Sequence, residues 1–71
     1  METFRDCKNR IACMGDAATG LVESLYKGCK TRTLLPIGAA FTVERDEVIT
    51  KVTRISTTAF QVESYYINLA A

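Results

Sequence analysis

The candidate ligand-binding residues of this sequence are cations and aromatic side chains. Three cations fall within residues 27–32, with no acidic residue among them. Positive groups beside aromatic rings are typical of single-stranded nucleic acid binding, because phosphates and bases then find complementary partners. A structural interpretation competes with this one, since helix C-termini attract lysines and the net charge is only +1. The candidate set is Lys27, Lys30, Arg32, Arg54, Tyr65 and Tyr66.

The sequence lacks the side chains on which most enzymes depend. It contains no His, which excludes a His general base, a Ser-His or Cys-His nucleophile pair and an imidazole metal site. Cys7, Cys13 and Cys29 form no CxxC motif and leave a structural zinc site without a fourth ligand. The acidic residues of segment 44–47 fall in a predicted solvated turn. We therefore expect a protein that is not an enzyme and that holds no metal and no cofactor.

Length and composition predict one small globular domain over residues 1–71. The chain is 48% hydrophobic and 24% charged, which is typical of a folding sequence. A chain of this size buries only about 60% of the surface that its unfolded form exposes, so its stability is marginal and oligomerisation is the expected remedy. The odd number of cysteines and the absence of a recognisable signal sequence favour free thiols and a cytoplasmic location. No stretch is apolar enough to predict a membrane partner.

The first third of the sequence predicts a helix over residues 4–27. A glycine at position 28 supplies a natural C-terminal stop. Gly15 and Gly20 each weaken such a helix by about 1 kcal/mol relative to Ala, so one kinked helix and two helices separated after Gly15 both fit. The apolar residues are three and four apart, as in a heptad repeat. They are Phe4, Cys7, Ile11, Met14, Ala18, Leu21 and Leu25.

This helix predicts a homodimer, because it would be longer than the sheet that covers it. A helix over 4–27 spans roughly 36 Å, whereas a strand of about seven residues spans roughly 23 Å. The uncovered apolar turns would face water unless a second copy or a host protein packed on them. The residues assigned to the dimer interface are Ile11, Met14, Ala18 and Leu21.

Residues 31–69 predict an antiparallel meander of three to four strands, at 31–35, 40–45, 48–55 and 59–69. Segment 45–47 lacks the Gly that tight primed hairpins prefer, so a looser loop is expected there. The fold class is therefore α+β, with a long N-terminal helix packed on this meander. The sheet side of the core is assigned to Phe41, Val43, Val52, Ile55, Phe60 and Val62.

Residues 38–64, GAAFTVERDEVITKVTRISTTAFQVES, resemble the meander of small SH3-like or Sm-like barrels. A strand with Phe and Val leads into a variable loop, followed by VTRIS, a tight turn and FQVE. Sm-like proteins also place a helix before their strands, although this chain offers four strand candidates where that fold has five. The resemblance implies an SH3-like arrangement of the meander and names no functional residue.

Two function classes remain after these exclusions. The first is a small non-catalytic interaction protein that binds a protein partner and inhibits or regulates it, in the manner of phage- or plasmid-encoded inhibitors of host enzymes. The second is a nucleic-acid-binding regulator on a small β-barrel. The near-neutral charge and the absence of catalytic groups favour the first class.

Overall fold

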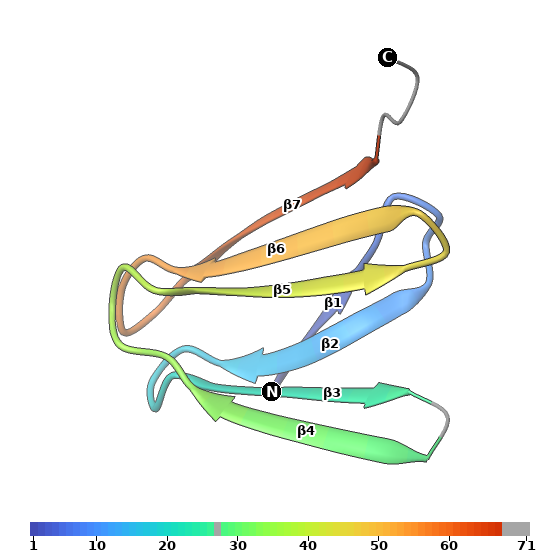
Figure 1. The fold of residues 1–71 in the computed structure, drawn as a ribbon. Helices are drawn as coiled ribbons and strands as arrows, with labels where there is room; N and C mark the ends of the chain where they lie inside the picture. Colours follow the sequence, from blue (N-terminus) through green and yellow to red (C-terminus); the bar gives the residue numbers. More distant parts are fainter. Residues whose placement is uncertain (27, 68–71) are drawn as a thin grey trace.

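The protein is an all-β sandwich in the computed structural model, which describes residues 1–26 and 28–67 (Figure 1). One antiparallel sheet, in the order β1-β2-β3-β4, consists of β1 (Glu2–Arg5), β2 (Ile11–Asp16), β3 (Leu21–Tyr26) and β4 (Cys29–Leu34). The second sheet, in the order β5-β6-β7, consists of β5 (Ala40–Arg45), β6 (Val48–Arg54) and β7 (Phe60–Tyr66). All paired strands are consecutive in the sequence, and the consecutive strands β4 and β5 belong to different sheets.

The predicted helix over 4–27, and with it the α+β class, is wrong. The described part of this segment forms two hairpins, and none of the described residues is helical. The first turn contains Asn9 and the second ends at Gly20, and both residues have positive φ angles that a helix does not allow. Asp16 fixes the second turn, because its backbone and side-chain oxygens accept hydrogen bonds from Gly20 and Ala18. Turn chemistry thus outweighs the apolar spacing.

Gly15 weakens a helix, but the sandwich requires it. Its Cα faces the edge-to-face aromatic pair of Phe4 and Phe60, whose ring centroids lie 5.2 Å apart. A Cβ at this position would lie 2.9 Å from the Phe4 ring and 3.0 Å from the Phe60 ring. The glycine therefore allows one aromatic side chain from each sheet to meet across β2.

The three strands of the second sheet lie close to their predicted positions, and the predicted strand at 31–35 corresponds to β4. The end of the predicted last strand falls outside the described residues. An SH3-like arrangement is wrong, because the meander has three strands and packs on a separate four-stranded sheet. The expected loose loop is also wrong: Asp46 and Glu47, with φ angles of 50° and 65°, form a two-residue primed turn between Arg45 and Val48.

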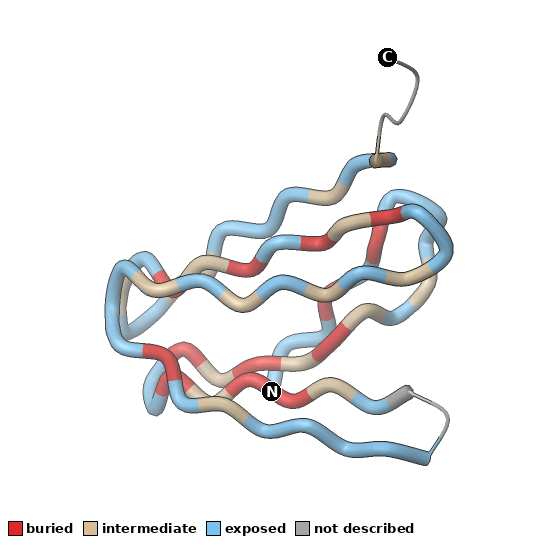
Figure 2. Tube along the Cα trace, viewed as in Figure 1, coloured by how far each residue is buried: buried red, intermediate tan, exposed pale blue. Residues whose placement is uncertain are grey.

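The core lies between the inner faces of the two sheets. Buried residues alternate with half-buried or exposed ones along β6, which identifies its inner face (Figure 2). The buried cluster contains Phe4, Cys13, Val22, Leu35 and Val52. The predicted core positions Phe41, Val43, Val52 and Phe60 are confirmed. The core predictions for Ile55 and Val62 are wrong. Ile55 is 49% exposed and lies beyond the end of β6, and Val62 is 38% exposed on the outermost strand β7.

The turns at one end of the sandwich are joined by charged groups. Asp6 accepts hydrogen bonds from the backbone N–H groups of Lys8 and Arg10 and from Nε of Arg10 at 3.0 Å. The same guanidinium donates to Asp46 at 2.7 Å, which links the β1–β2 turn to the β5–β6 turn. Burial alone would raise the pKa of the Asp6 carboxyl, but these hydrogen bonds and the Arg10 charge outweigh it and lower that pKa.

Candidate interaction surface

Four apolar side chains gather on the outer face of the four-stranded sheet. The strand register places them on one face, since Met14 lies opposite Glu23, Leu21 opposite Leu34 and Leu25 opposite Lys30. Leu25 and Leu34 are 65% and 69% exposed, whereas Met14 and Leu21 are half-buried. We call this set, Met14, Leu21, Leu25 and Leu34 with Glu23, Lys30 and Arg32, the outer patch.

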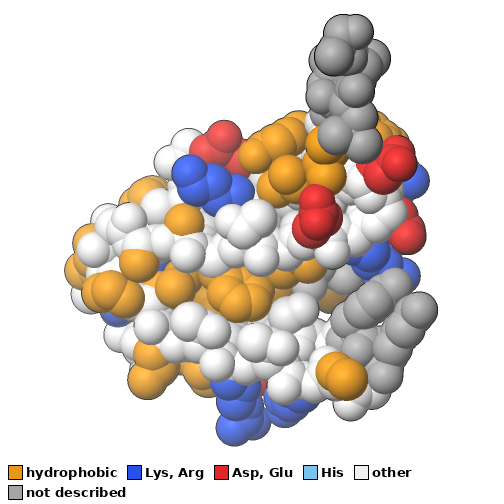
Figure 3. Space-filling view, viewed as in Figure 1, with side chains coloured by type: hydrophobic (Ala, Val, Ile, Leu, Met, Phe, Trp, Pro, Cys, Tyr) orange, Lys and Arg blue, Asp and Glu red, His pale blue; other side chains and the backbone are white. Residues whose placement is uncertain are grey.

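Two ion pairs lie within the outer patch. The Glu23 carboxylate contacts Arg32 Nε at 3.2 Å and Lys30 Nζ at 3.4 Å, and only 11% of its side chain is exposed. Both cations come from the edge strand β4 and are themselves more than half exposed. In Figure 3, Lys and Arg side chains protrude at the lower edge of the molecule, with hydrophobic side chains beside them. The patch therefore combines apolar area with a net positive charge.

Arg54, one of the predicted binding residues, is a structural residue. It is 9% exposed, and its guanidinium donates to three backbone carbonyls: Ala17 at 3.0 Å, Leu35 at 3.0 Å and Ala18 at 3.2 Å. These carbonyls belong to the β2–β3 turn and to the residue that follows β4. Arg54 thus joins the two sheets at the end of the sandwich opposite Arg10 (Figure 1).

The other predicted binding residues do not form one site. Lys30 and Arg32 lie on β4, whereas Tyr65 and Tyr66 lie on β7 at the far edge of the other sheet. The two tyrosines are neighbours in a strand and point to opposite faces. Tyr66 has the Lys8 ammonium 5.6 Å above its ring centroid. Lys27 lies outside the described residues.

The residues predicted for a helical dimer interface are divided by the β structure. Met14 and Leu21 share the outer patch. Ala18 is exposed in the β2–β3 turn, and Ile11 is 52% exposed at the start of β2. The helix that brought these four residues onto one face is absent from the described chain.

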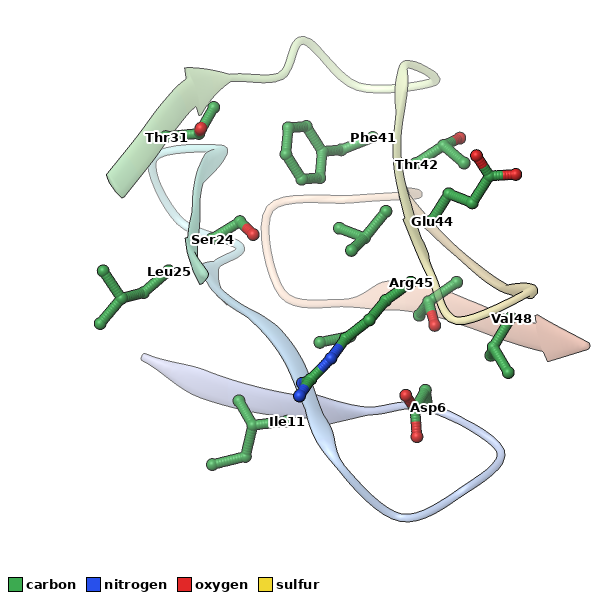
Figure 4. Close-up of a pocket in the computed structure, with 13 residues that line it drawn as sticks. Asp6, Ile11, Ser24, Leu25, Thr31, Phe41, Thr42, Glu44, Arg45 and Val48 are labelled. Atoms are coloured by element: carbon green, nitrogen blue, oxygen red, sulfur yellow. The ribbon is translucent and has the colours of Figure 1, made fainter. Parts of the chain in front are cut away.

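A groove runs between the two sheets on the side where β5 faces β3 and β4 (Figure 4). Its volume is about 250 Å³. The wall from the second sheet consists of residues 41–45 of β5 with Val48 and Thr50 of β6, and Ser24, Leu25 and Thr31 contribute to the opposite wall. Figure 3 shows hydrophobic atoms along this seam.

The described residues contain no cluster of His, Cys, Asp or Glu that could hold a metal ion. Cys7 and Cys29 are exposed, while Cys13 is buried in the core, which raises the pKa of its thiol to about 11. A buried thiol of this kind packs as a small hydrophobic side chain. No described helix is long and apolar enough to cross a membrane.

Sequence reasoning missed the outer patch residues Glu23, Leu25 and Leu34 as a group. The available signal is period two: Leu21, Glu23 and Leu25 alternate with the inward Val22 and Ser24. The same leucines also fit the three-and-four spacing of a helix, which concealed the alternation.

No protein-family model, no curated protein and no solved structure matches the chain.

Proposed function

We propose that this protein is a non-catalytic interaction protein that binds a protein partner through the outer patch and thereby inhibits or regulates it. The observation that supports the proposal is the exposure of Leu25 and Leu34 beside Lys30 and Arg32 on one sheet face.

The exposed leucines favour a bound state energetically. Burying one leucine side chain contributes about 1.5–3 kcal/mol. Scattered exposed apolar residues are ordinary, but here two of them flank an ion-pair cluster and adjoin the half-buried Met14 and Leu21. Met and Arg are also enriched in the centres of protein interfaces.

The charge of the outer patch indicates the partner's chemistry. Lys30 and Arg32 share one carboxylate, that of Glu23, so one positive charge is left over. We therefore expect the partner to present an apolar centre with acidic residues at its rim, which would strengthen the contact and speed association at low salt.

Site-specific photo-crosslinking in the cells that make the protein tests this proposal. A photoreactive side chain replaces Leu34 in one variant and Ile55, an apolar and exposed position just beyond the end of β6, in the control. We expect a protein adduct from position 34 and none from position 55. With the captured protein purified, Leu25→Asp should weaken binding by at least about tenfold, since hot-spot truncations cost more than about 1.4 kcal/mol.

The same experiment distinguishes a second copy from a different partner. An adduct of twice the chain mass, together with a dimer in light scattering that Leu25→Asp converts to a monomer, identifies a homodimer through this face. If position 34 yields no adduct beyond that of position 55 and the purified chain is a monomer, the outer patch is not an interaction surface.

A further inference from the structure

The groove between the sheets follows the free edge of strand β5. Its wall contains the consecutive residues Phe41, Thr42, Val43, Glu44 and Arg45. Successive side chains of a strand point to opposite faces, so a cavity on one face of a sheet touches every second residue. Contact with five residues in a row therefore places the groove alongside the backbone of β5. Among the described strands, β5 pairs with β6 only.

The hydrogen-bond alternation identifies the backbone groups on this edge. The backbone N–H of Arg54 donates to the carbonyl of Ala39, so the N–H and C=O groups of Arg54 point toward β5. Every second residue of β6 does the same, and their partners on β5 are Phe41, Val43 and Arg45. The intervening residues Thr42 and Glu44 consequently direct their N–H and C=O groups to the free edge, into the groove.

The size and lining of the groove favour a peptide over a small molecule. At about 250 Å³ it is smaller than the roughly 300–1,000 Å³ of sites for drug-sized ligands. Its apolar surface comes from the half-buried rings and methyl groups of Phe41 and Val43, which border the core. A few apolar side chains of an extended strand would complete that surface.

Glu44 adds a charge requirement. Its backbone lines the groove while its exposed side chain points away from it (Figure 4), and its carboxylate forms no ion pair with any residue that the structure describes. In an added strand, the residue directly opposite Glu44 would lie about 5.5 Å away at its Cα and project to the same face. A Lys or Arg at that position would be the complementary residue.

We propose that the groove binds an extended segment of another protein, which adds to the edge of β5 as a fourth strand of the second sheet. Its alternate side chains are apolar and enter the groove against Phe41 and Val43. The outward side chain opposite Glu44 is Lys or Arg. The groove meets the outer patch at Leu25, which belongs to both, but Thr42 and Glu44 belong to the groove alone and Leu34 to the outer patch alone, so variants at these positions test the two sites independently.

The substitution Thr42→Pro tests the backbone part of the proposal. It removes the N–H that faces the groove and leaves the Val43 N–H, which pairs with β6, in place; proline is tolerated at such edge positions. Thr42→Val is the matched control, because it changes the same exposed side chain and keeps the N–H. Thermal unfolding of both variants verifies that the sandwich is intact.

The probe is a phage-displayed library of random peptides of about twelve residues, long enough to exceed an ordinary strand. We expect panning against the wild-type protein to enrich peptides with alternating apolar residues and a Lys or Arg between them. Their affinity should fall at least about tenfold for Thr42→Pro and stay within about twofold for Thr42→Val, the first loss being that of a buried hydrogen bond. Failure to enrich any peptide overturns the proposal, as does equal affinity for the two variants.

Amide exchange and a charge swap locate the bound strand. In the complex, the Thr42 and Glu44 amides should exchange more slowly by about tenfold or more, while the amide of Leu34, which does not line the groove, is unchanged. Protection confined to β1, β4 or β7 would assign the peptide to another sheet edge and contradict the proposal. Glu44→Lys should weaken the selected peptides, and replacing their basic residue with Glu should restore binding; if affinity is indifferent to both charges, Glu44 has no part in recognition.

Discussion

The guanidinium of Arg54 donates a hydrogen bond to the backbone carbonyl of Leu35 across 3.0 Å, which ties the three-stranded sheet to the chain that leaves the four-stranded one. Two further bonds reach Ala17 and Ala18 in the β2–β3 turn. Hydrogen bonds to charged groups contribute about 1.5–3 kcal/mol each and are not additive within one side chain. We expect Arg54→Ala to lower the free energy of unfolding by about 3 kcal/mol, measured by urea denaturation.

Arg32→Ala is the control for this prediction. Its side chain is 63% exposed and pairs with Glu23 at the surface, so its removal should cost less than about 1 kcal/mol. Equal losses for the two variants would show that Arg54 does not join the sheets.

The Asp46–Glu47 turn stores conformational strain that one substitution can relieve. Glu47 has a φ of 65°, and the left-handed region costs a non-glycine residue about 1–2 kcal/mol. We expect Glu47→Gly to raise the free energy of unfolding by about 0.5–1 kcal/mol, since the gain exceeds the added entropy of the unfolded chain. The same change at Glu63, within β7, should lower it by about 0.5–1 kcal/mol. A destabilised Glu47→Gly protein would contradict the turn geometry.

The lowered pKa of Asp6 predicts a pH-dependent contribution to stability. The pKa of the Asp6 carboxyl is lower in the folded protein than its ordinary value of 3.8, so the unfolded chain binds the proton more readily than the folded one. At pH values above 3.8 the ionised carboxyl therefore contributes its full stabilisation to the fold. This contribution is lost as the pH falls from 3.8 through the lowered pKa. Asp6→Asn should therefore be less stable than the wild type at pH 7 by about 1–3 kcal/mol, with a difference that shrinks toward pH 2.

Urea denaturation of both proteins across this pH range measures the difference. The exposed side chain of Glu63 supplies the control, because a surface substitution such as Glu63→Gln should change the free energy of unfolding by no more than about 0.5 kcal/mol. A difference for Asp6→Asn that stays constant down to pH 2 would mean that the ionised form of Asp6 is not what stabilises the turns.

The three thiols should react in two phases. Cys7 and Cys29 are exposed, while Cys13 is buried and has a pKa of about 11, so it offers little thiolate at neutral pH. A disulfide-exchange reagent at pH 8 should label two thiols rapidly and the third only as the fold opens. In denaturant without reductant, all three should react at once. A count of one under those conditions would reveal an intramolecular disulfide.

The sequence predicts the second sheet better than the first, because only in the second sheet do the hydrophobic residues fit a single spacing, the two-residue alternation of a strand. Val48, Thr50 and Val52 are β-branched and alternate with outward residues, which no amphipathic helix imitates. In the first third, Phe4, Met14 and Leu21 fit a helical spacing, yet they occupy both faces of a sheet. The turn between β2 and β3 contains two alanines, so only Asp16 before them and Gly20 after them indicate that the chain reverses its direction there.

The candidate site was harder to predict than the strands, because it depends on which strands lie at an edge. Lys30 and Arg32 are candidate binding residues because of their charge. The structure places them on β4, beside leucines that the helix prediction includes. Arg54 is a candidate because of its charge as well, but its guanidinium N–H groups donate to backbone carbonyls of the protein itself. Whether a cation is free depends on carbonyls distant in sequence, which no local pattern contains.

The pairing of each strand with its sequence neighbour has a consequence for how the chain acquires its structure. Hairpins form in about 1–10 μs, and a topology made of neighbouring pairings has little loop-closure entropy to overcome before the first contacts form. The four-stranded sheet can assemble from residues 2–34 before Arg54 of the second sheet packs against its turn. The late event is then the docking of the two halves, which we expect to set the overall folding rate.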